Sequence, residues 1–208
     1  ELDAREDRME LEQEVASAEA GIDEELNEAR QAWRSFASES EQELEALGEA
    51  IEANTAQLSA ATEARWQEIE GEAREVRAEL EEDLSRLENA TGDEVRELER
   101  EIAEERRELE RWMHEARYVA ASSFEEFKRK VNDDLTTMGR DLEALEREVE
   151  AGSAQVTDAT RQELSEMRAE WDELEREVAN LEREAGEGMT AARLELAEEV
   201  AEFRQGLG

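Results

Sequence analysis

The chain has 208 residues, of which 42% are charged and 4% aromatic, and its formal net charge is −37. It contains no cysteine and no proline, which excludes disulfides and cysteine-based zinc sites and leaves nothing to force a sharp end to a helix. Because nucleic acids are bound through clustered Lys and Arg, the charge argues against a nucleic-acid partner. No apolar run approaches the roughly 20 residues that a membrane-spanning helix needs.

The acidic composition has two explanations that the sequence leaves open. Nearly all basic residues are arginine, and the only lysines are Lys128 and Lys130. Such a surface is typical of proteins that live in high salt, but it also follows from arginine-rich codon usage and the helix preference of glutamate. The chain begins at Glu1 rather than methionine, which favours a processed or exported protein. The compartment otherwise stays unknown.

The spacing of apolar residues predicts an all-helical chain. From Val15 to Leu207 the large apolar residues recur every three or four positions, at a mean step of about 3.6 residues. The stripe is narrow, and it mixes eleven-residue with seven-residue repeats, which favours little net supercoil. We therefore expect an all-α fold: a very long helix or a helical hairpin that forms an extended coiled coil.

Residues 1–111 are expected to form the first coiled-coil arm. Val76, Leu87, Leu98 and Leu109 share one eleven-residue register. The segment 89–93 has the chemistry of a helix end, with Gly92 as a possible cap. Leu87 and Leu98 nevertheless keep the repeat in phase across this segment, so the pattern predicts that the helix continues.

Residues 112–130 depart from the pattern because aromatic, apolar and basic side chains crowd together there. Three interpretations remain open: a hairpin tip or kink, a docking site for another protein or surface, or a wider patch in an unbroken helix. Ser123 and Glu126 have the spacing of a capping box that opens a second helix. The candidate docking residues are Trp112, Met113, His114, Tyr118, Val119, Phe124, Phe127, Lys128, Arg129 and Lys130.

Residues 131–208 are expected to form the second arm. Its eleven-residue register is the longest in the chain. With the first arm it predicts one seam of apolar side chains, whose main members are Leu87, Leu98, Leu109, Leu145, Val156, Met167, Val178, Met189 and Val200.

The inventory of reactive groups predicts neither an enzyme nor a cofactor. The chain has no cysteine nucleophile and no glycine-rich phosphate loop. The only histidine is His114, and Arg111 stands where a di-metal helix motif would need glutamate. We therefore expect no catalytic residue, no cofactor and no metal site.

The Val76–Leu109 and Leu145–Val200 series resemble the repeats of apolipoprotein A/E-type proteins. More loosely, they are similar to phasins and to helical proteins that protect against drying. The resemblance covers most of the chain and rests on eleven-residue amphipathic repeats in a Glu-, Arg- and Ala-rich sequence. It implies a helical protein that coats a lipid or polymer surface.

The apolar stripe itself favours a helix as its partner. A lone helix of this length would be about 310 Å long and would leave its stripe in water. A helix that lies on lipid has a wider apolar face flanked by Lys and Arg, whereas the flanks here are Glu. The leading hypothesis is a non-enzymatic structural or scaffolding protein that associates with itself or with another helical protein. A coat on a lipid or polymer granule and a stress-protective, inducible helix are the alternatives.

Overall fold

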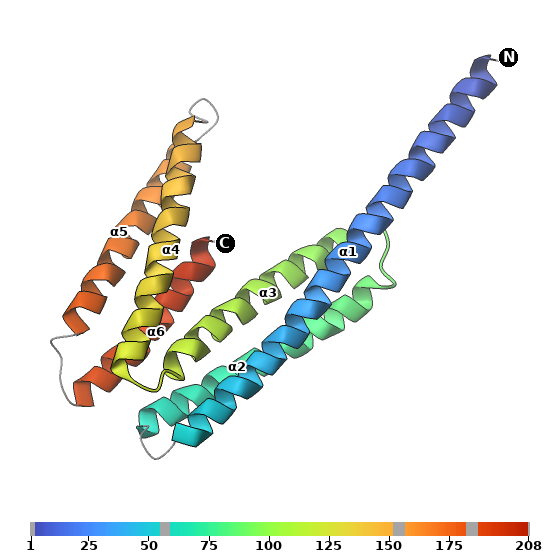
Figure 1. Cartoon of the computed structure of the whole chain (residues 1–208). Coiled ribbons are helices and arrows are strands. Elements are labelled where there is room, and N and C mark those ends of the chain that lie inside the picture. Colours follow the sequence, from blue (N-terminus) through green and yellow to red (C-terminus); the bar gives the residue numbers. More distant parts are fainter. Residues whose placement is uncertain (1–2, 55–58, 152–156, 182–186, 208) are drawn as a thin grey trace.

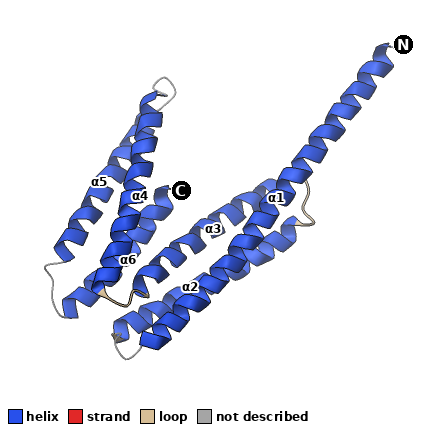
Figure 2. Ribbon diagram, in the orientation of Figure 1, coloured by secondary structure: helices blue, strands red, loops and turns tan. Residues whose placement is uncertain are grey.

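The computed structural model describes the backbone of residues 3–54, 59–151, 157–181 and 187–207, and the side chains of 27–53, 59–151, 157–181 and 189–207. Within these ranges the chain forms six helices. Figure 2 shows helices and loops there, and no strand. The all-helical prediction is confirmed. The helices are α1 (Asp3–Asn54), α2 (Ala60–Leu87), α3 (Asp93–Val119), α4 (Phe124–Ala151), α5 (Asp158–Leu181) and α6 (Glu187–Leu207).

Helices α1, α2 and α3 make the first of two three-helix units (Figure 1). Helices α2 and α3 form an antiparallel hairpin, and the carboxyl-terminal half of α1 packs against both. Their shared core includes Ile69, Leu80, Leu87, Leu98 and Ile102, which are all fully buried. Apolar residues at a helical period therefore bury the stripe within the chain.

Helices α4, α5 and α6 make the second unit, with a core that includes Phe127, Val131, Leu174, Val178 and Val200. The two units are joined by a short turn between α3 and α4 and by the packing of α6 on α3 and α2.

The turn between α3 and α4 confirms the predicted start of a helix after Ser123. The backbone N–H of Glu126 donates to the Ser123 hydroxyl at 3.2 Å. In return the Glu126 carboxylate accepts bonds from the backbone N–H of Ser122 at 3.0 Å and from its hydroxyl at 2.7 Å. These bonds lower the pKa of Glu126 to about 2. The caps satisfy N–H groups that a helix start leaves unpaired.

The predicted extended coiled coil, whether one very long helix or a hairpin of two arms, is wrong. Helix α2 ends at Leu87 and α3 begins at Asp93. Between them Gly92 has a φ of 63°, a conformation that glycine adopts at little cost and that reverses the chain. The eleven-residue phase survives because Leu87 and Leu98 both face the interior of the hairpin, not because the helix continues.

The predicted seam is divided between the two cores. Leu87, Leu98 and Leu109 are fully buried in the first. Val178 and Val200 are buried in the second, where Met167 packs while half-buried. Leu145 and Met189 are half-buried, and Val156 lies outside the described residues. The chain buries its own stripe because the helices are joined in one molecule and therefore lie close enough to pack against one another.

Candidate functional site

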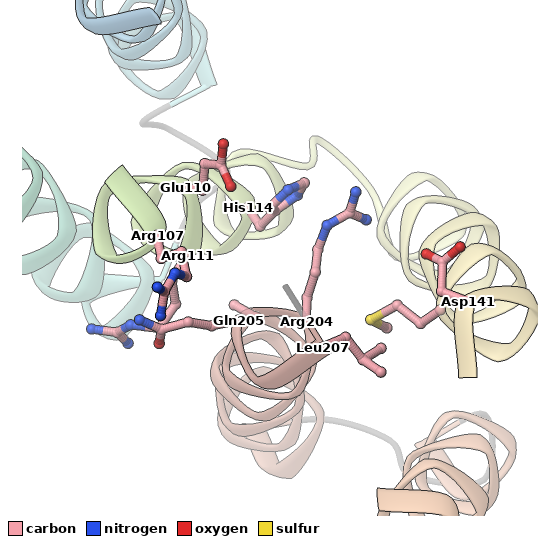
Figure 3. Close-up of a pocket in the computed structure, with 10 residues that line it drawn as sticks. Arg107, Glu110, Arg111, His114, Asp141, Arg204, Gln205 and Leu207 are labelled. Atoms are coloured by element: carbon pink, nitrogen blue, oxygen red, sulfur yellow. The ribbon is translucent and has the colours of Figure 1, made fainter. Parts of the chain in front are cut away.

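Charged side chains from three helices gather where α3, α4 and α6 meet. A pocket of about 230 Å³ opens there, and Figure 3 shows arginines from α3 and α6 around it. Its lining carries charges of both signs and one imidazole. The lining residues are Arg107, Glu110, Arg111, His114, Met138, Asp141, Ala201, Arg204, Gln205 and Leu207.

Asp134 of α4 joins three helices beside this pocket. Its carboxylate accepts a bond from the Tyr118 hydroxyl of α3 at 2.6 Å and another from Arg204 of α6 at 2.7 Å. Tyr118 is 1% exposed and packs edge-on against Phe127, with ring centroids 6.3 Å apart. Burial and the adjacent carboxylate raise the pKa of Tyr118. The hydroxyl therefore stays a donor, and Asp134 holds the second unit to α3.

Arg117 of α3 makes the matching connection to α1. Its guanidinium donates two bonds to the Glu43 carboxylate, one of them at 2.7 Å. Its backbone carbonyl accepts a bond from Lys130 of α4 at 3.1 Å. The paired guanidinium lowers the pKa of Glu43, so this carboxylate remains charged.

His114 lies near both the Asp134–Arg204 pair and the Glu43–Arg117 pair, and its imidazole is uncharged at neutral pH. Burial lowers its pKa to about 4, and the positive charges of Arg204 and Arg117 act in the same direction. Its Nδ1 lies 3.3 Å from an Arg117 nitrogen. A neutral imidazole in this position can accept a hydrogen bond from the guanidinium.

A more deeply buried ion pair lies in the joint between the two units. Glu115 of α3 is fully buried and accepts a bond from Arg65 of α2, whose guanidinium also lies 3.2 Å from Glu198 of α6. Burial raises the pKa of Glu115, and the Arg65 charge opposes that effect. Removing Arg65 would leave Glu115 as an uncompensated buried charge, whereas Arg65 also lies 2.8 Å from Glu68.

The structure gathers the predicted docking residues around this joint, but most of them point inward. Phe124 is half-buried against the second core, and His114 lines the pocket. Trp112, Met113, Tyr118, Val119 and Phe127 are each at most 7% exposed. Their side chains are thus occupied by the chain itself, and their role in docking a partner stays a prediction.

The basic part of the predicted docking segment is more accessible. Arg129 is exposed and lies 3.5 Å from Asp133. Lys130 is half-buried and lies 3.2 Å from Glu126, while Lys128 is half-buried. These contacts lie along the first turns of α4 and hold that helix in its own register.

Sequence reasoning missed the polar partners of the joint. Asp134, Arg204 and Glu43 look like ordinary members of charged helix faces, and their pairing depends on how distant helices meet. Glu115 did leave a signal: it lies three residues after Trp112 and four before Val119, on the apolar face. A carboxylate at such a position needs a buried partner.

Comparisons with models of protein families, with curated proteins and with solved structures find no match to this chain. Within the described ranges no three His, Asp or Glu side chains are placed to hold a metal ion. No described helix is both long and apolar enough to cross a bilayer.

Proposed function

We propose that this chain is a non-enzymatic structural protein that associates with copies of itself through helix-to-helix contacts. The observation that carries the proposal is that the amino-terminal half of α1 projects beyond the helices with which it packs (Figure 1). The projecting half of α1 makes the contact with another copy, and the two three-helix units form the part of each copy that is linked in this way.

Helix α1 is longer than the two helices with which it packs, and the difference gives the length of the projecting part. Helix α1 has 52 residues, against 28 in α2 and 27 in α3. Arg30 donates to the carbonyl of Leu87, the last residue of α2, and Arg34 pairs with Glu88 just beyond it. About 24 residues of α1 therefore precede the end of the hairpin, which is about 36 Å of helix.

The sequence register continues from the packed half of α1 into the projecting half. Val15 lies about five helical turns before Trp33, and Ile51 lies about five turns after it. Ile51 is buried in the first core, and Trp33 packs against that core. Ile22 and Leu26 share the same register. The sequence register therefore extends beyond the part of α1 that other described helices accompany in Figure 1.

Charge sets the conditions for association. The chain carries a net charge of −37, so two copies repel each other at low salt. Burial of each large apolar side chain contributes about 1.5–3 kcal/mol and does not depend on ionic strength in this way. Association is therefore expected to strengthen as added salt shortens the Debye length.

Analytical ultracentrifugation tests the proposal at about 0.05 M and about 0.5 M NaCl, where the Debye length differs roughly threefold. We expect a mass of at least twice the 23.7 kDa chain, and a larger associated fraction at high salt. The double variant Val15→Glu, Ile22→Glu is expected to be monomeric. Its control Gln13→Glu, Ala20→Glu adds the same charge on the opposite side of the helix and should associate like the wild type.

Two results would replace the proposal. A wild-type chain that is monomeric at both salt concentrations would show that it does not associate with itself. Flotation with neutral and anionic vesicles, lost in the Val15→Glu, Ile22→Glu variant, would show that the projecting helix binds lipid and would favour the coat function.

A further inference from the structure

The turn between α2 and α3 carries the single Asn-x-Ser/Thr tripeptide of the chain. It consists of Asn89, Ala90 and Thr91, and the residue that follows it is Gly92 rather than proline. A tripeptide of this kind, in which the middle residue is not proline, is the acceptor sequence for N-linked glycosylation. The motif is short, so its place in the structure has to show that it is suited to this role.

The backbone of the turn is suited to an acceptor asparagine. The chain has five asparagines, and Asn89 is the one that lies outside the helices. The other four belong to α1, α4 and α5: Asn27, Asn54, Asn132 and Asn180. An acceptor has to enter the active site of another protein, and a turn at the surface can do so whereas a packed helix cannot.

The folded protein has room for a sugar at this position. The side chains of Asn89 and Thr91 are both exposed. A Cβ built on Gly92 would have nothing within 4 Å, so the space beside the turn is open. Figure 1 shows the turn on the side of the first unit that faces away from α4, α5 and α6. A glycan on Asn89 would therefore extend into solvent without displacing any described helix.

The turn does not depend on the side chain of Asn89. Asparagine is common in turns because it tolerates a positive φ or bonds to nearby backbone. Among the described residues a positive φ occurs at Gly92 alone. The Asn89 side chain makes no hydrogen bond to any residue that the structure describes. Its backbone N–H does donate to the carbonyl of Arg86 at 3.0 Å, but every residue except proline can make that bond.

The hydroxyl of Thr91 is likewise unused by the fold. Thr91 stands just before Gly92, the N-cap of α3, which has no side-chain hydrogen bond to its helix. Within the described part of the chain the Thr91 side chain makes no hydrogen bond either. The amide and the hydroxyl that a glycosyltransferase has to recognise are thus both available in an exposed turn.

We infer that Asn89 is an N-glycosylation site, to which an oligosaccharide is transferred from a polyprenyl-phosphate carrier as the chain is exported. In this step Nδ2 of Asn89 forms a bond to the anomeric carbon of the first sugar and loses one proton to a base of the transferase. The bond between that carbon and the phosphate oxygen breaks, and its electron pair leaves with the polyprenyl phosphate. Thr91 is needed because the transferase recognises its hydroxyl together with the amide.

The site lies beside the point where α1 leaves the α2–α3 hairpin. Arg34 of α1 pairs with Glu88, the residue before Asn89. A glycan here adds polar bulk to this end of the hairpin and shields it from contact with other copies. The inference does not rest on the proposed self-association, because it depends only on the tripeptide and the turn that holds it.

Mass spectrometry of the chain purified from the cells that make it tests the site. Trypsin cleaves after Arg86 and Arg96, so the peptide 87–96 contains the whole tripeptide and no other asparagine. We expect this peptide to carry a sugar mass that fragmentation assigns to residue 89. A peptide that occurs only at its unmodified mass would overturn the inference, and so would a sugar attached to Thr91 instead.

Substitutions at the two recognised positions test the specificity. Asn89→Gln and Thr91→Ala should each lose the sugar completely, whereas Thr91→Ser should retain it because serine also supplies a hydroxyl. Asn132→Gln changes an exposed asparagine of α4 outside the tripeptide and should leave the modification unchanged. Circular dichroism should show the same helix content in all four variants, since none of these side chains holds helices together. A sugar that persists in Thr91→Ala would contradict N-linked recognition.

Discussion

At Gly139 on α4 the missing side chain makes room for an indole ring. A Cβ built on this residue would lie 3.0 Å from the Trp171 ring of α5. The same ring donates its N–H to the backbone carbonyl of Leu135 at 3.0 Å, which holds the ring against α4. This glycine therefore has a packing role that outweighs its low helix propensity.

Alanine substitutions at two glycines should change stability in opposite directions. Gly71→Ala places a methyl group where nothing lies within 4 Å and should stabilise the fold by about 1 kcal/mol. Gly139→Ala gains the same propensity but displaces Trp171, and overpacking of this kind costs about 1–3 kcal/mol. Urea unfolding measures both changes. Equal stabilisation by the two variants would contradict the close packing of the indole.

At the scale of single residues, the sequence identifies unusual residues but does not predict their contacts. Trp112, Tyr118 and Phe127 stood out correctly as members of an unusual cluster, because aromatic residues are rare in this chain. That they point inward depends on the neighbouring helices, which no local pattern contains. Asp134 gave no signal, since an Asp that binds Tyr118 and Arg204 has the same sequence surroundings as one in solvent.

At the scale of the helices, one carboxyl pair lies between α2 and α3. Glu105 faces Asp83, which is 7% exposed and is bound by Arg86 at 2.6 Å. One oxygen of Glu105 is buried without a hydrogen-bond partner in the described structure. Burial raises the pKa of Glu105 to about 7, and the negative charges of Asp83 and Glu79 add to this shift.

A similar pair lies between α5 and α6. Burial raises the pKa of Glu199 to about 7, and a shared hydrogen bond with Glu177 acts in the same direction. Glu195 and Glu173 add further negative charge. Glu105 in the first unit and Glu199 in the second are therefore stabilised when their carboxyl groups are protonated.

These carboxyls predict that acidification stabilises the fold near neutral pH. They ionise near 4.5 in the unfolded chain and near 7 in the folded protein, so the folded state holds protons that the unfolded state has lost. The melting temperature should rise as the pH falls from about 8 to about 5.5. Glu105→Gln, Glu199→Gln should be more stable than the wild type at pH 8 and should show a smaller rise.

The control for this prediction is Glu94→Gln, Glu104→Gln, which removes the same charge from exposed positions of α3. An equal pH dependence in both double variants would contradict it. His114 acts in the opposite direction at lower pH. Its pKa is about 4 in the folded protein against 6.5 in the unfolded chain, so its contribution to stability is lost as the pH falls from about 6.5 to about 4.

Some helix ends can be predicted from the sequence, whereas others depend on the tertiary structure. The capping residues Ser123 and Glu126 predicted the start of α4 because a cap is a local hydrogen-bond pattern. The end of α2 does not follow from the sequence, because the phase of Leu87 and Leu98 predicts a continuous helix in spite of Gly92. A hairpin preserves such a phase whenever both flanking residues face its interior.

For the whole molecule, the burial of the stripe within the chain predicts a much shorter particle than a rod. A single helix would be about 310 Å long and a simple hairpin roughly 155 Å, whereas α1, the longest helix, is about 78 Å. X-ray scattering of the Val15→Glu, Ile22→Glu variant should give a largest dimension well below the hairpin value. The dimension should be the same at low and high salt, because the contacts lie within one chain. A value near 155 Å or 310 Å would contradict the six-helix packing.

The helical fold follows from the amino-acid pattern alone, because a 3.6-residue apolar period without proline suits no other regular structure. It also determined that the stripe must be covered, because apolar side chains at this spacing cannot all remain in water. What covers the stripe depends on how the helices pack in space. Five helices and half of a sixth bury most of the stripe against one another, because reversing at a glycine brings a partner close at a small cost in chain entropy. The 3.6-residue period specifies a helix, but it does not specify the direction in which each helix runs or which helices pack together. The joint around Glu115 and the projection of α1 therefore follow only from the tertiary structure.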